Sequence, residues 1–233
     1  MERLDKLLAA TGRWSRKQAK ALVKQGRVLV AGQLPQGPED KVEEGTTVTV
    51  DGWPIVTQRY VYLMLHKPAG VISSTQDPRE KTVIDLLPRD LRRLDLFPVG
   101  RLDKDTEGLL LLTNDGPLAH ELLAPGKHVE KVYYARVEGL LDQADQAAFQ
   151  EGITLADGTA CRPAKLEILS PAHQCLVTLG EGKYHQVKRM LASRGKPVTY
   201  LKRLSMGPIA LDPGLAPGAW RPLRQEELAS LGR

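Results

Sequence analysis

The 233-residue chain has few of the features that mark a disulfide-bonded, zinc-binding or membrane-spanning protein. Its two cysteines, Cys161 and Cys175, form no CxxC pair and have no nearby histidine at a metal-type spacing. This argues against a disulfide framework or a zinc site and predicts two free, buried thiols. No apolar run approaches the roughly 18 residues needed to cross a bilayer. The amino terminus is charged from Glu2 onward, unlike a secretory signal. We therefore expect a cytoplasmic protein without a membrane segment.

Aromatic residues are also scarce, and acidic residues are outnumbered by basic ones. Aromatics make up 5% of the chain, so stacking of bases on aromatic side chains is not expected to dominate contacts with RNA. The formal net charge is +5 and the sequence pI is about 9.2, which suggests a polyanionic partner. The sequence has neither a P-loop nor a G-x-G-x-x-G segment, and it shows no cluster of metal-ligand residues.

Residues 1–51 have the pattern of a small α/β module. Leucines at helical spacing predict a first helix, and Ser15 is a suitable N-cap for a second helix that ends at Gly26. Two short alternating segments after it predict strands. Residues 52–59 contain a Trp-Pro pair and a polar stretch, and we expect them to form a linker.

The second helix of this module and the turn after it carry a block of positive charge. Between Arg13 and Arg27 six residues are basic and none is acidic. Such a block can lie against a phosphate backbone, although a solvated helix face is the alternative. The basic residues of the module that we expect to contact RNA are Arg3, Arg16, Lys17, Lys20 and Arg27.

Residues 60–233 follow a different pattern, with many apolar or alternating runs typical of strands. A helix is predicted over residues 115–123 with Pro117 at its first position, and another over residues 184–195 that ends at Gly195. The strands and helices do not alternate as regular βαβ units. This region therefore predicts an α+β fold with a mostly antiparallel sheet.

The segment GRLDKDTEGLLLLTNDG, residues 100–116, places three acidic residues directly before an apolar run. Asp, Thr and Gly are turn formers, so Asp103, Asp105 and Glu107 could simply belong to the loop between two strands. Loops at strand ends also carry more than their share of catalytic groups. Arg101 stands beside the acids and would keep a partly buried carboxylate ionised. Spacing alone leaves both interpretations open.

The motifs around this segment are similar to those of a known enzyme family. Residues 100–116 resemble the active-site motif of the pseudouridine synthases, and residues 1–51 resemble the S4 RNA-binding module. The order of these blocks is that of the RsuA-type branch, which acts on ribosomal RNA. The other segments that resemble motifs of this family are LHKPAGVISSTQDP (65–78), HVEKVYYARVEG (128–139) and GEGKYHQVKRMLASRG (180–195).

The resemblance implies three catalytic residues. Asp103 matches the essential aspartate of the family, which acts either as a nucleophile at C1′ or as a base at C2′. Tyr133 matches the tyrosine that packs against the target base, and Lys188 matches the basic residue that pairs with the aspartate. On a helix, Lys188 and Arg189 diverge by about 100°, so we expect Lys188 to face Asp103 and Arg189 to contact RNA phosphate. Asp105 is interpreted as a turn and surface residue.

Other residues of this region receive weaker interpretations. Glu107, like Asp105, is taken as a turn and surface residue. His66 and His185 are discounted as acid–base groups, because the chemistry of this family is not built on histidine and neither has a nearby cysteine or second histidine. Local pairing is the alternative for Arg101, and a plain strand end is the alternative for Lys67. The residues of this region that we expect to contact RNA are Arg101, Lys67, Lys183 and Arg189.

The implied activity is the isomerisation of one uridine to pseudouridine in ribosomal RNA, with no metal and no organic cofactor. The segments YHQVKRM and EKVYY and the short C-terminus favour small-subunit (16S) over large-subunit (23S) ribosomal RNA. A non-catalytic RNA-binding factor for ribosome assembly is the rival from another class. The expected partner is ribosomal RNA or an assembly particle, and the expected state is a monomer.

Overall fold

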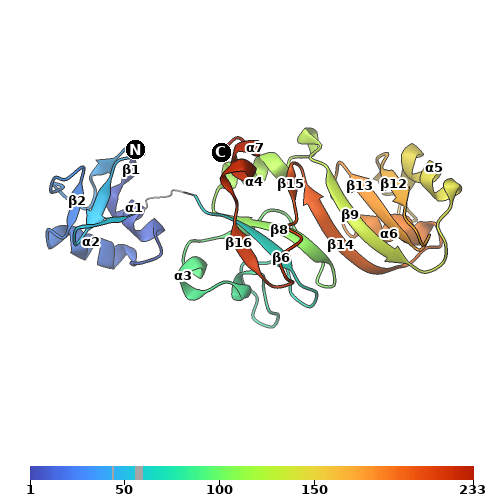
Figure 1. Ribbon diagram of the computed structural model, residues 1–233, viewed down its shortest axis with the longest axis horizontal. Coiled ribbons are helices and arrows are strands. Elements are labelled where there is room, and N and C mark those ends of the chain that lie inside the picture. The colour runs from blue at the N-terminus through green and yellow to red at the C-terminus, as the bar shows by residue number, and fades with distance from the viewer. Residues whose placement is uncertain (44, 56–59) are drawn as a thin grey trace. The chain divides into compact units, whose positions relative to one another are not determined.

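A computed structural model describes residues 1–43, 45–55 and 60–233 (Figure 1). The chain divides into two compact units. The first comprises Met1–Val61 together with Leu87–Leu96, and the second comprises Tyr62–Leu86 together with Phe97–Arg233. The linker expected over residues 52–59 lies partly outside the described residues, and its described part contains a short strand instead of a plain loop.

The first unit is a small α/β module. Ser15 begins the second helix with a capping box, as predicted: its side chain accepts from Gln18 N–H, and the Gln18 side chain accepts from Ser15 N–H. Strand β4 pairs antiparallel with β2 and β5, and β1 pairs antiparallel with β3. The elements are β1 (Glu2–Arg3), α1 (Leu4–Ala10), α2 (Arg16–Lys24), β2 (Val28–Val30), β3 (Lys41–Val42), β4 (Val48–Val50), β5 (Trp53–Ile55) and α3 (Arg89–Arg92).

The inner faces of α1 and α2 bury their apolar residues against this small sheet. Leu4 and Leu8 on α1 and Leu22 on α2 form one core cluster with the valines of β2 and β4. This burial explains why a helix of only seven residues is stable here, since isolated helices of this length are marginal in water.

The second unit is built on one long sheet with the strand order β12-β13-β9-β14-β8-β6-β16, which can be followed in Figure 1. Strand β15 pairs with β14, and β7 pairs with β8. Within this sheet every pair is antiparallel except β14 with β8. The predicted α+β fold with a mostly antiparallel sheet is therefore confirmed. Its strands are β6 (Tyr62–Lys67), β7 (Phe97–Pro98), β8 (Glu107–Thr113), β9 (Lys131–Val137), β12 (Lys165–Ile168), β13 (Gln174–Leu179), β14 (Val198–Met206), β15 (Ile209–Ala210) and β16 (Trp220–Pro222).

Helices pack along this sheet. Leucines of α4 and α7 join one apolar cluster with residues of β6 and β8. Asp115 caps α4, with Pro117 in the first turn as predicted. A small hairpin of β10 and β11 follows α5. The remaining elements are η1 (Ile84–Leu86), α4 (Gly116–Leu123), η2 (Pro125–Lys127), α5 (Gln143–Glu151), β10 (Ile153–Thr154), β11 (Ala160–Cys161), α6 (Gln186–Ser193) and α7 (Gln225–Ser230).

The parallel contact between β8 and β14 positions the segment that carries Asp103. Gly108 on β8 lies opposite Arg203 on β14, and its φ of +106° is a conformation that favours glycine. A β carbon at Gly108 would overlap the backbone of Arg203. Only glycine therefore allows β8 to approach β14 this closely. The loop directly before β8, residues 99–106, carries Asp103 and Asp105 and is called the acidic loop below.

Arg203 is a charged residue in the interior of the protein. It is only 2% exposed. Its Nε donates to the carbonyl oxygen of Leu109 at 2.8 Å. Arg203 therefore connects β14 to β8 from within the sheet.

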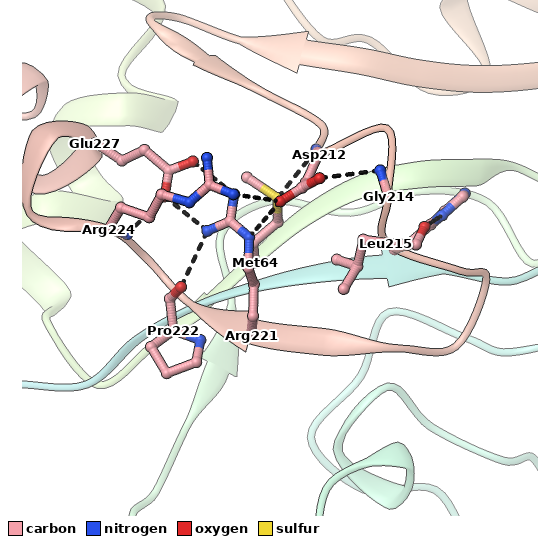
Figure 2. Close-up of polar contacts among 9 residues, drawn as sticks. Met64, Asp212, Gly214, Leu215, Arg221, Pro222, Arg224 and Glu227 are labelled. Atoms are coloured by element: carbon pink, nitrogen blue, oxygen red, sulfur yellow. Dashed lines mark hydrogen bonds and ion pairs between the residues drawn. The ribbon is translucent and has the colours of Figure 1, made fainter.

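The C-terminal segment is fastened to the sheet by an ion-pair network. Figure 2 shows Arg221 between Asp212 and Glu227, with Nε 2.8 Å from Asp212 Oδ2 and Nη2 2.8 Å from Glu227 Oε1. Arg224 adds a second contact to Asp212 at 3.0 Å, and the Asp212 amide donates to Met64 Sδ on β6. The network ties β16 and α7 to β6, the strand whose last residue is Lys67.

Two other expectations concern membrane crossing and the thiols. Among the described residues, no helix combines the length and apolarity that crossing a membrane requires. Cys161 and Cys175 are both free and buried, as predicted. Burial raises the pKa of the Cys175 thiol to about 11, which keeps it protonated and unreactive at neutral pH.

Candidate active site

Asp103 lies on the loop between β7 and β8, and this loop is anchored on both sides of it. The Leu102 amide donates to Ser73 Oγ at 3.0 Å, and Ser73 Oγ donates back to the Leu102 carbonyl at 2.8 Å. The Thr106 amide donates to the Asp103 carbonyl at 3.1 Å. The Asp103 side chain is 28% exposed. The loop therefore fixes the position of Asp103, while its carboxylate stays accessible to another molecule.

Lys67, the last residue of β6, holds this loop in place through hydrogen bonds from its side chain. Its side chain is fully buried, and Nζ donates to the carbonyl oxygens of Pro68 at 3.0 Å, Lys104 at 3.2 Å and Thr106 at 2.9 Å. Burial lowers its pKa from 10.5 to about 8, against the opposing charges of nearby carboxylates such as Asp105. The expectation that Lys67 contacts RNA is wrong, because its ammonium group is enclosed by the protein's own backbone.

Lys188, the third residue of α6, reaches the acidic loop from another element. Its Nζ lies 3.0 Å from Asp103 Oδ2 and 2.6 Å from Asp105 Oδ1. Burial acts to lower the pKa of Lys188, but the hydrogen bonds and charges of Asp105 and Asp103 outweigh it and raise that pKa. The hydrogen bond from Lys188 likewise lowers the pKa of Asp105. Lys188 is thus a firmly charged partner for both carboxylates.

Arg189 and Lys183 lie near Lys188 in the sequence but have other partners. Arg189 Nη2 lies 2.5 Å from Asp157 Oδ2, away from the acidic loop as the helical period requires. Lys183 Nζ donates to the Ala160 carbonyl and lies 3.5 Å from Glu181 Oε2. Both residues were expected to contact RNA. In the structure their charges hold the β10–β11 hairpin and the turn before α6.

Histidine 185 is the residue that sequence reasoning missed. It was discounted because no cysteine or second histidine stands nearby, yet its Nε2 lies 3.4 Å from Asp103 Oδ1. It occupies the N-cap position of α6, three residues before Lys188. That spacing of one helical turn was the available signal, since residues three apart on a helix share a face.

The other acidic and basic residues of the loop differ from one another. Asp105 is 74% exposed in the turn, as expected. Glu107 is instead the first residue of β8, where it accepts a 2.7 Å hydrogen bond from Tyr200 Oη. Burial, followed by this bond, raises the pKa of Tyr200 to about 12. Arg101 is exposed, and among the described residues it forms no ion pair with Asp105 or Glu107.

Tyr133 lies on β9, two strands away from β8. It pairs with Arg203 on β14, and Arg203 in turn pairs with Gly108 on β8. At the usual spacing of neighbouring strands this places Tyr133 about 10 Å from Gly108 across the sheet. Tyr133 is 9% exposed, whereas Tyr134 points to the opposite face. His66 is also buried, with Nδ1 2.6 Å from the carbonyl oxygen of Leu215.

In the first unit, most of the basic residues expected to contact RNA surround one aspartate. Asp5 is fully buried and lies 3.0 Å from Arg3, 3.2 Å from Arg16 and 3.8 Å from Lys20. These three side chains remain between 43% and 56% exposed. The basic block is therefore partly neutralised by an acidic residue on α1, which the block itself does not contain.

Of the other two basic residues of this unit that were expected to contact RNA, Arg27 has an ion-pair partner and Lys17 has none among the described residues. Arg27 Nε donates to Asp51 Oδ1 at 2.8 Å, and both side chains are exposed. Lys17 is exposed and has no ion-pair partner among the residues that the structure describes. Lys17 is therefore the member of the predicted set with the freest charge.

Comparison with known proteins follows the same division of the chain. Residues 61–193 match the family model described as RNA pseudouridylate synthase, and residues 2–48 match the S4 domain. An uncharacterized RNA pseudouridine synthase, YtzG, of Bacillus subtilis is 49% identical over 230 residues, 97% of this chain and 96% of the relative. The ribosomal small subunit pseudouridine synthase A of Pseudomonas aeruginosa is 43% identical, covering 98% of this chain and 100% of the relative.

A solved structure agrees with these sequence relatives. The crystal structure of a pseudouridylate synthase matches 99% of this chain and 100% of its own, with a TM-score of 0.70 and 34% identity. The similarity therefore includes the S4 domain, the long sheet and the acidic loop together.

Proposed function

The chain belongs to the RNA pseudouridylate synthase family, and we propose that it converts one uridine of small-subunit ribosomal RNA to pseudouridine. A pseudouridine synthase is an isomerase. The observation that carries the proposal is the Asp103 carboxylate, held on a braced loop, paired with Lys188 and still open to substrate. The S4 domain and the names of relatives, such as the small subunit enzyme of Pseudomonas aeruginosa, support ribosomal RNA as the substrate.

Asp103 is proposed as the residue that begins the reaction. The bond between N1 of the base and C1′ of the sugar breaks, the base rotates, and C5 bonds to C1′. The C5 proton leaves and N1 gains one, so that atoms balance without oxidation or hydrolysis. An unprotonated carboxylate can either attack C1′ or remove the C2′ proton. Both routes need the partial exposure and the cationic partner that Asp103 has.

Lys188 and Tyr133 are proposed as the other two catalytic residues. Lys188 keeps a positive charge 3.0 Å from the Asp103 carboxylate and fixes its direction. Tyr133 presents a largely buried aromatic side chain on the same sheet, suited to pack against a uracil that has left its stack. Arg101, exposed two residues before Asp103, is proposed to contact a phosphate of that nucleotide.

The first unit is proposed to anchor the RNA. Its exposed cations Arg16, Lys17 and Lys20 lie on one helix, α2, and can follow a phosphate backbone. This binding should weaken steeply as salt rises, since each phosphate contact releases counterions. Catalysis at saturating RNA should depend far less on these residues.

The test is release of tritium from RNA labelled at C5 of uridine. Full-length protein is incubated in parallel with small-subunit rRNA, large-subunit rRNA and small-subunit assembly particles. Release from the small-subunit rRNA or its particle, approaching one tritium per RNA, is expected. Release from large-subunit rRNA alone would overturn the small-subunit assignment. Tight binding with no release from any substrate would instead favour an RNA-binding assembly factor.

A further inference from the structure

Two aromatic rings stand in contact beside the active-site carboxylate. Tyr184 is 71% exposed, one of the few large apolar side chains on the surface of the described residues. Its ring stacks on the imidazole of His185, with centroids 3.8 Å apart and planes 17° from parallel. Nε2 of the same imidazole lies 3.4 Å from Asp103 Oδ1. A continuous path of contacts therefore runs from an open aromatic face to the reacting carboxylate.

The backbone holds these rings in place before any ligand arrives. Consecutive side chains on an extended chain point in opposite directions. At His185 the chain turns into the left-handed region, with φ +48° and ψ +34°, so the two rings can stack. The buried Gln186 locks this turn, since it accepts from the Lys183 amide at 2.9 Å and donates to Glu181 at 2.6 Å.

We propose that Tyr184 is a platform on which an unstacked RNA base lies, and that His185 links this platform to Asp103. The proposal rests on the proposed function, because it assumes that RNA enters this site. An exposed flat ring suits a flat aromatic ligand, and the base of a nucleotide is one. Aromatic side chains with an open face are the usual stacking partners of unstacked RNA bases.

The base on Tyr184 is a neighbour of the target uridine and not the target itself. His185 stacks on one face of Tyr184 and contacts Asp103 through its ring nitrogen, so an RNA base can stack only on the other face of Tyr184. On that face the tyrosine ring separates the base from the imidazole that contacts Asp103, as expected for a nucleotide beside the target. The platform would hold the flanking nucleotide while the target uridine enters the space at Asp103.

His185 acts on the reaction through Asp103, as a positioning residue. Lys188 contacts Oδ2 of Asp103, and His185 contacts the other oxygen, Oδ1. The two contacts come from one turn of α6, so they restrict rotation of the carboxylate about its final bond.

Three variants at two positions test the two parts of the proposal separately. Tyr184→Ala removes the platform and leaves His185 beside Asp103, while Tyr184→Phe keeps an aromatic face. His185→Phe keeps a ring under Tyr184 and removes the polar contact with Asp103. Leu140→Ala and His120→Phe serve as controls, since both residues are exposed and lie outside the site. Initial rates of tritium release are measured against RNA concentration for each full-length protein, after circular dichroism has established folding.

Tyr184→Ala should raise KM by roughly 5- to 100-fold, the factor that one base–aromatic stack contributes, with kcat changed less than about threefold. Tyr184→Phe should restore the wild-type KM. His185→Phe should lower kcat by about tenfold with little change in KM, as expected for a misplaced carboxylate. Both controls should match the wild type within about twofold, since neither residue contacts the rings or Asp103.

The outcomes distinguish this inference from the function on which it rests. If the wild type releases tritium but Tyr184→Ala has an unchanged KM, the platform does not exist and the proposed function stands. If Tyr184→Phe is as impaired as Tyr184→Ala, the hydroxyl group and not stacking matters, and the platform is again wrong. An unchanged kcat in His185→Phe would overturn the link to Asp103. Absence of release by the wild type would overturn the proposed function and this inference together.

Discussion

Each of the two units contains one aspartate that is surrounded by basic side chains. The comparison shows how burial distinguishes a structural carboxylate from one that another molecule can reach. In the first unit Asp5 is fully buried and contacts Arg3 and Arg16. In the second unit Asp103 contacts Lys188 and His185 but keeps 28% of its side chain exposed. Both sites therefore contain a carboxylate with cationic neighbours, and they differ in whether another molecule can reach it.

The consequence of this difference is chemical. At Asp5 both carboxylate oxygens are used by Arg3 at 3.0 and 3.1 Å, and Arg16 adds a further bond. Such a group ties α1 to α2 and has no free direction from which to react. Asp103 is held through two contacts from one helix and remains open on its other side. We conclude that Asp5 is structural and propose that Asp103 is catalytic.

Among changes to the partners of the two aspartates, the largest effect should come from removing the cation at Asp103. Lys188→Met deletes the charge that lies 3.0 Å from Asp103 and 2.6 Å from Asp105. We expect kcat to fall by about 10²- to 10³-fold, the size of effect typical for loss of one charged contact in an active site. Steady-state tritium release measures the change.

Asp105→Asn is the matched control for this variant. It removes the other carboxylate of the same lysine, and Asp105 is 74% exposed. Exposed pairs contribute little, so turnover should stay within about threefold of the wild type. If Asp105→Asn were as impaired as Lys188→Met, Asp105 would have to join the reacting groups and the comparison would fail.

A second prediction concerns Lys67, a cation near Asp103 that is itself buried. Lys67→Met fills a similar volume but removes the three donors that hold the carbonyls of Pro68, Lys104 and Thr106. The loop of Asp103 should shift, and a shift of about 1 Å can lower turnover by about 10²-fold. Steady-state turnover at pH 7 measures this loss. Lys104→Met on the same loop, whose exposed ammonium pairs with Glu80, should match the wild type.

The pKa of Lys67 also gives this prediction a pH dependence. Burial places that pKa at about 8, so the ammonium loses its proton there, and a neutral amine has only two N–H groups for three carbonyls. Turnover should fall as pH rises through about 8, and Lys67→Met should lack this limb. Stability should move in the opposite direction. The unfolded chain keeps its proton up to 10.5, so the cost of burying the charge is full below pH 8 and disappears toward pH 10.5.

The smallest effect on activity should come from the buried aspartate. Asp5→Asn weakens its contacts with Arg3, Arg16 and Lys20, and we expect the free energy of unfolding of the first unit to fall by about 1–3 kcal/mol. Turnover at saturating RNA should stay within about threefold. Urea unfolding followed by tryptophan fluorescence measures the stability, because Trp14 lies in this unit.

The contribution of Asp5 to the free energy of unfolding should depend on pH in the acid range. The hydrogen bonds from Arg3, and then from Arg16, lower the pKa of Asp5 against the effect of burial. A lowered pKa contributes stability that is present above the ordinary value of 3.8 and is lost as pH falls through the folded-state pKa. Asp5→Asn should remove this part of the acid dependence. Asp51→Asn, at the exposed pair with Arg27, should change little, and an equal effect there would contradict the role of burial.

Features set by local spacing were predictable from the sequence. Ser15 was predicted as an N-cap because its hydroxyl group can accept from a backbone amide at the helix start, and the structure shows this bond within a capping box. The family resemblance matched Lys188 to the basic partner of the aspartate, and the helical divergence of about 100° implied that Arg189 faces elsewhere. In the structure Lys188 lies beside Asp103, and Arg189 pairs with Asp157.

Features set by tertiary burial could not be predicted in this way. A lysine after an apolar strand indicates a surface position, yet Lys67 is fully buried because three carbonyls converge on it. In β14, Lys202 and Arg203 interrupt the apolar pattern of the strand, although Arg203 is buried within the sheet. The spacing of His185 from Lys188 was visible in the sequence, but the contact of His185 with Asp103 also depends on a left-handed backbone conformation that no residue type in that segment indicates.

The most direct test of the central claim compares the two aspartates in one experiment. Single-turnover tritium release from C5-labelled ribosomal RNA is measured for the wild type, Asp103→Asn and Asp5→Asn, with each rate normalised to folded protein. We expect no release above background from Asp103→Asn, whose RNA affinity should stay within a few-fold of the wild type, and near-normal release from Asp5→Asn. Release by Asp103→Asn at a rate close to that of the wild type would contradict the assignment of Asp103 as the reacting carboxylate.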